Sequence, residues 1–185
     1  FTGDVTLNQN AILDVANSNA LGTGRLVFNG GALRPNLNLG FNRVTQALSL
    51  ANNVVMLGDA VFDANGGAYA DLTLSGSVSL SDAAYGAATG SARTFTQNNP
   101  YARVVLSGVV QDGTGGGFNH FIKAGPGFID LQGANTYTGF TQINAGLLNL
   151  GGASALPVAS HVMLNGGALG VLNQDLTITN DLTVL

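Results

Sequence analysis

Aspartates are the first residues to test for chemistry, because all ten acidic residues of the chain are Asp. Asp59, Asp63 and Asp71 form the closest cluster. Inverting polysaccharide hydrolysis needs two carboxyl groups about 6.5–9.5 Å apart, one of them with a raised pKa. The chain has no adjacent Asp pair, and a glycine corner at 66–67 divides this cluster. Lyases need a strong base and clustered Arg or Lys, whereas Lys123 is the only lysine. These residues predict no catalytic site.

The two histidines, His120 and His161, are the candidate metal ligands. They are far apart in the sequence and have no adjacent Cys or carboxylate. A metal site needs convergent ligands, so exposed strand or loop positions are the interpretation favoured for both. Lys123 is interpreted as a solvated charge at a corner of the fold. The sequence therefore predicts no metal-binding residue.

Glycine-rich segments raise two further possibilities, a phosphate loop and a calcium-binding β-roll. GTGGG at 113–117 lacks the following Lys-Ser/Thr and a helix start, so a glycine corner is favoured. Calcium β-rolls repeat Gly-Gly-x-Gly-x-Asp. GGAYAD (66–71) and DGTGGG (112–117) each occur once and out of pattern. No cofactor is expected.

Composition points to an architecture made of strands. Only 9% of the 185 residues are charged, against about 25% in a typical domain. Glu is absent and Lys nearly so, which leaves an exposed helix surface without its usual residues. The 27 glycines, with abundant Asn and Thr, indicate short strands and tight turns. The sequence predicts an all-β fold.

Charge and hydropathy exclude several partners. A net charge of −4 with six scattered basic residues argues against nucleic acid, because phosphate neutralisation needs clustered Lys and Arg. The absence of Cys excludes a disulfide framework and a thiolate metal site. No run approaches the roughly 18 apolar residues of a membrane helix, so membrane insertion by this segment is not expected.

Internal repeats are the strongest organisational signal. Residues 1–33 and 137–169 both begin aromatic-Thr-Gly and both end in NGGAL, with a constant offset of 136 (137 − 1 and 165 − 29). LTLSG (72–76), VVLSG (104–108) and IDLQG (129–133) share an apolar-x-Leu-x-Gly pattern. Their spacings, 32 (106 − 74) and 25 (131 − 106), fall in the range of solenoid repeats.

Period-2 runs such as Leu148 and Leu150 place apolar side chains on one face of short strands. Asn, Gly and Asp punctuate these runs. An antiparallel sandwich with hairpin turns is the alternative, but short strands and head-to-tail repeats favour a parallel β-helix. Equivalent residues then stack about 4.8 Å apart, Leu on Leu and corner Asn on Asn. Residues 81–103 lack this alternation of apolar residues, which predicts a loop or insertion there.

Residues 121–150, FIKAGPGFIDLQGANTYTGFTQINAGLLNL, resemble the passenger-associated β-strand repeat of bacterial autotransporter-type surface proteins. The matching elements are Lys123, Gly125 and Gly127, then Leu131 and Gly133, then Asn135 to Gly139, then Asn144 and Gly146, then Leu148 and Leu150. Pro126, Phe128 and Phe140 depart from that pattern. The resemblance implies a right-handed parallel β-helix (β-solenoid), extracellular or on the surface of a Gram-negative-type bacterium. Residues 1–185 are then expected to form one β-helix segment of a longer chain.

Three functions follow as expectations. The first is a structural stalk or scaffold that stacks end to end on neighbouring coils of the same or an identical chain. The second is an adhesin whose residues 81–103 or exposed faces bind host or matrix glycans or proteins. A polysaccharide-active enzyme is the third, and the sparse aspartates favour it least.

Overall fold

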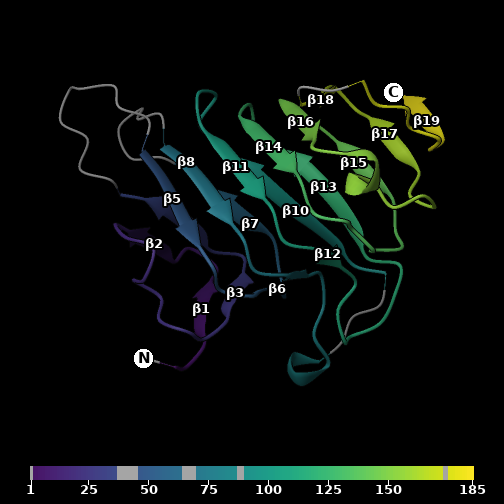
Figure 1. Ribbon diagram of the computed structural model, residues 1–185. Helices are drawn as coiled ribbons and strands as arrows, with labels where there is room; N and C mark the ends of the chain where they lie inside the picture. Colours follow the sequence, from purple (N-terminus) through teal and green to yellow (C-terminus); the bar gives the residue numbers. More distant parts are fainter. Residues whose placement is uncertain (1, 37–45, 64–69, 87–89, 173–174) are drawn as a thin grey trace.

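The computed structural model describes residues 2–36, 46–63, 70–86, 90–172 and 175–185 (Figure 1). In these residues the regular structure is almost entirely strand. The helical elements there are two 3₁₀ turns, η2 (Ala83–Tyr85) and η3 (Ala153–Ala155). Every pair of strands is parallel, and the strands form three sheets. The predicted all-β parallel β-helix is confirmed.

Three sheets, here called A, B and C, form the sides of the helix. Sheet A contains β1 (Val5–Asn8), β3 (Leu26–Asn29), β6 (Val54–Met56), β9 (Val78–Ser79) and β12 (Val110–Gln111). Sheet B contains β2 (Ile12–Val15), β4 (Ala32–Pro35), β7 (Ala60–Phe62), β10 (Ala92–Gln97), β13 (His120–Ala124), β15 (Thr141–Ile143), β17 (Val162–Leu164) and β19 (Leu182–Val184). Sheet C contains β5 (Gln46–Leu50), β8 (Ala70–Leu74), β11 (Arg103–Leu106), β14 (Phe128–Leu131), β16 (Leu147–Leu150) and β18 (Ala168–Val171).

The chain visits the sheets in turn, as in β6, β7 and β8, and each visit to the same sheet begins a new coil. Figure 1 shows the coils progressing from the purple N-terminal end to the yellow C-terminal end. Coil length varies. The coil that separates the register partners Ala60 and Phe95 is much longer than the one that separates Phe121 and Thr141. The length of a coil is therefore not fixed by a strict sequence period.

Stacked apolar side chains fill the interior. In sheet C one column joins Leu50, Leu74, Leu106, Leu131 and Leu150 in direct register, and all five are buried. A second column is aromatic and runs through Phe28, Phe62, Phe95, Phe121 and Tyr137, with ring centroids 4.6–6.5 Å apart. Such ring pairs stabilise beyond their burial. The core is continuous along the axis.

The three apolar-x-Leu-x-Gly units occupy equivalent positions, as predicted. Their leucines, Leu74, Leu106 and Leu131, are register partners in sheet C. The two unequal intervals between these leucines are thus the lengths of two coils. Asn ladders are confirmed too, because Asn29 donates to the Asn8 side chain (3.0 Å) and Asn165 to that of Asn144 (3.1 Å).

The longer repeat, which relates residues 1–33 to residues 137–169, is rotated around the helix. NGG at 29–31 turns from β3 in sheet A to β4 in sheet B. NGG at 165–167 turns from β17 in sheet B to β18 in sheet C. The turns are alike, with φ of +91° at Gly30 and +90° at Gly166, values that favour glycine. The repeat therefore encodes a strand–turn–strand unit that fits two different corners.

The glycine of each Leu-x-Gly unit lies directly over the one before. A Cβ at Gly108 would lie 2.0 Å from the Gly76 carbonyl oxygen, and one at Gly133 would lie 2.2 Å from the Gly108 carbonyl oxygen. The obstructing atoms belong to the backbone of the neighbouring coil. A side chain there would force two coils apart.

We expect Gly108→Ala to lower the free energy of unfolding by about 3 kcal/mol, since overpacking against backbone cannot be relieved by a rotamer change. Gly3→Ala is the matched control, because within the part of the chain that the structure describes no heavy atom lies within 4 Å of the added Cβ. Urea unfolding measures both. Equal stability of the two variants would contradict the close stacking of Gly76, Gly108 and Gly133.

The predicted loop at 81–103 is shorter in the structure, because strand β10 (Ala92–Gln97) lies within that range in sheet B. Its inward positions include Gln97, which is buried, so the period-2 signal was hidden by polar residues. The described loop residues before β10 include η2. Arg25 donates hydrogen bonds to the Asp82 carboxylate and the Tyr85 hydroxyl oxygen in this loop. Arg25 also forms an ion pair with Asp4 at 2.7 Å. These bonds hold the loop against the first coils.

Candidate functional site

The three aspartates that are closest in the sequence lie at different places on the coil. Asp59 and Asp63 flank β7 at opposite ends, and Asp71 lies in β8 of sheet C. Asp59 is engaged structurally, since its Oδ1 accepts a hydrogen bond from the Thr94 backbone N–H at 2.8 Å. In the described ranges no three His or Asp side chains gather as metal ligands. Of the calcium-like fragment 66–71, residues 66–69 lie outside the described residues.

The GTGGG segment (113–117) forms a corner between β12 and β13. Gly113 and Gly116 have φ of +86° and +115°, conformations that favour glycine. Asn119 is fully buried beneath the loop and donates to the Gly116 carbonyl oxygen at 2.7 Å. Asp112 accepts from the Asn119 N–H at 3.1 Å. The glycines of the GTGGG segment therefore serve a tight turn, as the interpretation of this segment as a glycine corner predicted.

The interpretation of Lys123 as a solvated charge is wrong. Lys123 is fully buried, and its register partners in sheet B are Phe95 and Ile143. Its Nζ donates to the carbonyl oxygens of Ala124 (2.8 Å), Gly125 (2.7 Å) and Ala145 (3.0 Å). Burial lowers the pKa of Lys123 to about 8. The ammonium group caps carbonyl oxygens at the corners of two successive coils.

Other polar side chains cap corner carbonyl groups in the same way. Asn52 donates to the carbonyl oxygens of Gly22 and Gly24, and Asn180 donates to those of Pro157 and Ser160. Corner carbonyl groups that lack a ladder partner need such donors, because an unpaired buried carbonyl group is costly. Lys123, Asn52 and Asn180 therefore have structural roles at the corners.

A polar group on the outer face of sheet C was missed from the sequence. Asp130 is fully buried and accepts a hydrogen bond from the Asn149 side chain at 2.8 Å. Arg103 forms an ion pair with it at 3.3 Å. Burial raises the pKa of Asp130, against the opposing hydrogen bond from Asn149. Asn149 alternates with the inward Leu148 and Leu150 and so points outward, yet it is only 6% exposed because it packs on Asp130.

The two histidines belong to one surface ladder. Phe121, Thr141 and Val162 are register partners, so the residues before them, His120, Phe140 and His161, follow one another along the axis. The His120 and Phe140 rings stack with centroids 3.8 Å apart. The sequence separation of the histidines is thus two coils, with Phe140 between them. They do not form a metal pair.

A backbone hydrogen bond fixes the tautomer of His120. Its Nδ1 accepts a hydrogen bond from the Phe140 backbone N–H at 3.0 Å, so the ring proton of the neutral imidazole is on Nε2. Burial lowers the pKa of His120, which favours this neutral form. His161 is exposed, as predicted, and its Nε2 lies 2.9 Å from the Thr183 hydroxyl group.

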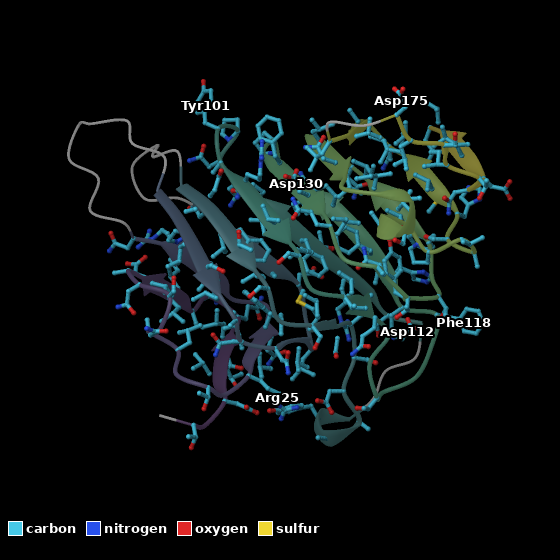
Figure 2. The ribbon with its side chains drawn as sticks, viewed as in Figure 1. Arg25, Tyr101, Asp112, Phe118, Asp130 and Asp175 are labelled. Carbon is cyan, nitrogen blue, oxygen red and sulfur yellow. The ribbon has the colours of Figure 1, made fainter. Side chains whose placement is uncertain are left out.

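Phe118 lies two residues before His120, at the end of the glycine corner. It is 71% exposed and has a φ of +62°, which is unusual for a bulky side chain. Figure 2 shows Phe118 projecting from the edge of the molecule, beyond Asp112. We call Phe118, His120, Phe140 and His161 together the aromatic stripe. Its groups can contact a ligand by ring faces and by an N–H donor.

Comparisons add no relative, since no family model, curated protein or solved structure matches the chain. Within the described residues, no helix has the length and apolar character needed to cross a membrane. The aromatic stripe and the continuous interior columns are therefore the observations on which functional proposals rest.

Proposed function

We propose that this chain is a structural scaffold, a stretch of β-helix that holds other parts of a secreted or cell-surface bacterial protein at a distance. The unbroken leucine column from Leu50 to Leu150 is the observation that carries the proposal. Each coil buries its apolar face only against its neighbours, so the stack behaves as one rod whose length grows with the number of coils. The bacterial surface location rests on the resemblance of residues 121–150 to autotransporter passenger repeats.

Stacking of further coils on the last strands is part of this proposal. Strand β19 lies at the edge of sheet B and exposes Leu182 and Val184 by 50% and 72%. An edge strand offers unpaired backbone groups that another strand can join. Coils of the same or an identical chain would continue the ladder there.

Duplication of residues 128–167 tests the scaffold. These residues span two coils, because Phe128, Leu147 and Ala168 are successive register partners. We expect the duplicated chain to fold with β-type circular dichroism and to be about 10 Å longer, given a rise of about 4.8 Å per coil. Small-angle X-ray scattering measures the maximum dimension.

A Gly/Ser segment of the same length, inserted at the same position, is the control. It adds a segment of equal length without strand pairing or an apolar column, so the rod should not lengthen along its axis. A duplicated chain that unfolds, or that scatters like the Gly/Ser control, would count against a modular scaffold.

A further inference from the structure

We propose that the aromatic stripe binds a neutral glycan, with Phe118 stacking on a pyranose ring beside the His120 Nε2–H donor. This goes beyond the scaffold role and does not depend on it. The backbone of Phe118 has a conformation that the fold alone does not explain.

The backbone conformation of Phe118 and the exposure of its apolar ring are both energetically unfavourable. A φ of +62° costs a non-glycine residue about 1–2 kcal/mol. Burial of the ring does not offset this cost, because the residue is 71% exposed. The three residues before it are glycines, so the chain readily supplies glycine in this loop. Strained residues of this kind cluster at ligand-binding sites.

The position of Phe118 is also fixed by its surroundings. Its N–H donates to the Thr138 hydroxyl oxygen at 2.7 Å, and that hydroxyl donates to Asp112 Oδ2 at 2.7 Å. Asn119, the next residue, is fully buried and holds the loop from beneath. The ring is thus presented from a rigid base, which reduces the entropy lost when a ligand binds.

The groups around Phe118 favour a sugar. His120 presents an Nε2–H donor, as its tautomer requires. Asp112 accepts three hydrogen bonds, from the Asn119 N–H and from the Thr138 N–H and hydroxyl group. An ionised carboxylate has about four acceptor sites, so one remains for a hydroxyl group. An exposed ring, an N–H donor and a carboxylate acceptor thus come from one short stretch, residues 112–120, and together they match the apolar face and the hydroxyl edges of a pyranose.

Charge restricts the glycan to a neutral one. The Asp112 carboxylate lies beside the site, and the chain carries a net charge of −4, so sulfated or uronic-acid chains would be repelled. An apolar peptide would need further exposed apolar surface. Phe140 and His120 are only half-exposed and stack on each other instead.

Titration calorimetry with the full chain tests the proposal. The probes are neutral oligosaccharides of four to six units: cello-, xylo-, manno- and chito-oligosaccharides. We expect at least one to bind, and Phe118→Gly to weaken its binding at least tenfold. Phe118→Gly should also raise the melting temperature, because glycine relieves the positive φ. Phe118→Tyr should retain binding.

Tyr101→Ala is the matched control, since Tyr101 is another exposed aromatic residue (61%) and lies outside the stripe. It should bind like the wild type. The proposal is overturned if no probe binds, if Phe118→Gly binds unchanged, or if Phe118→Gly lowers the melting temperature. Preferential binding of sulfated or uronic-acid oligosaccharides, or of apolar peptides, would overturn the ligand class. None of these outcomes bears on the rod length that tests the scaffold.

Discussion

Leu150→Asp is expected to abolish cooperative folding of the C-terminal coils. Leu150 is fully buried and lies in register between Leu131 and Val171. Removing a buried leucine side chain costs about 2–5 kcal/mol. Burying an unpaired carboxylate costs several more. The sum is comparable with the whole stability of a domain, about 5–15 kcal/mol. Urea unfolding followed by circular dichroism measures the loss.

Ser49→Asp is the control for a carboxylate on the outer face of sheet C. Ser49 is exposed and lies between two inward leucines, Leu48 and Leu50. It should change stability by less than about 0.5 kcal/mol. Asn149→Asp should fall between the two, because it sets a second carboxylate against the buried Asp130. Equal damage from Leu150→Asp and Ser49→Asp would mean that the two faces are exchanged, as a one-residue slip of register would do.

The sequence predicts the stacked architecture because stacking imposes like residues at like positions. Leu74, Leu106 and Leu131 share a motif since each must fill the same column. Gly108 is a glycine because a carbonyl oxygen of the preceding coil, that of Gly76, leaves no room for a Cβ. The stacking of corner Asn residues can be predicted from the sequence for the same reason. These features depend on the immediate neighbours along the chain and one coil away.

Contacts that depend on coil length were not predictable. His120 and His161 form one ladder only because the coils from Phe121 to Thr141 and from Thr141 to Val162 are both short and nearly equal in length. Other coils of sheet B are longer, as between β7 and β10, so the sequence interval alone does not indicate adjacency. The sequence also does not show that the two NGGAL segments lie at different corners of the helix, because the local turn is the same at both.

Buried polar groups were hidden for a further reason. An isolated lysine in a glycine-rich stretch has the same sequence signature whether it is solvated or caps carbonyl oxygens. The acceptor at Ala145 lies across one coil from Lys123. Asn149 and Asp130 alternate correctly with their apolar neighbours and point outward, yet they bury each other. Period-2 alternation gives the direction of a side chain but not what covers it.

Lys123→Met is the second substitution expected to have a large effect. Methionine matches the length of the lysine stem and suits the apolar positions of Phe95 and Ile143 on either side. It leaves the three carbonyl oxygens without the Nζ donor. We expect a loss of about 2–4 kcal/mol, the cost of unsatisfied buried acceptors less the gain from removing a buried charge. Ile122→Met, at the half-buried neighbouring position, introduces the same residue and should cost less than about 1.5 kcal/mol.

The pH dependence of stability separates the ammonium group from general packing. Burial lowers the pKa of Lys123 to about 8 from its ordinary value of 10.5. Between these values the unfolded chain binds more protons than the folded chain, so the free energy of unfolding rises with pH. The slope is at most about 1.4 kcal/mol per pH unit. Burial raises the pKa of Tyr137 to about 12, which lowers stability only above the ordinary tyrosine pKa of 10.0.

Urea unfolding from pH 8 to 10 should therefore show a rise in the free energy of unfolding for the wild type and for Ile122→Met, and no such rise for Lys123→Met. A flat wild-type profile would mean that Nζ is hydrated, and the carbonyl cap would then be wrong.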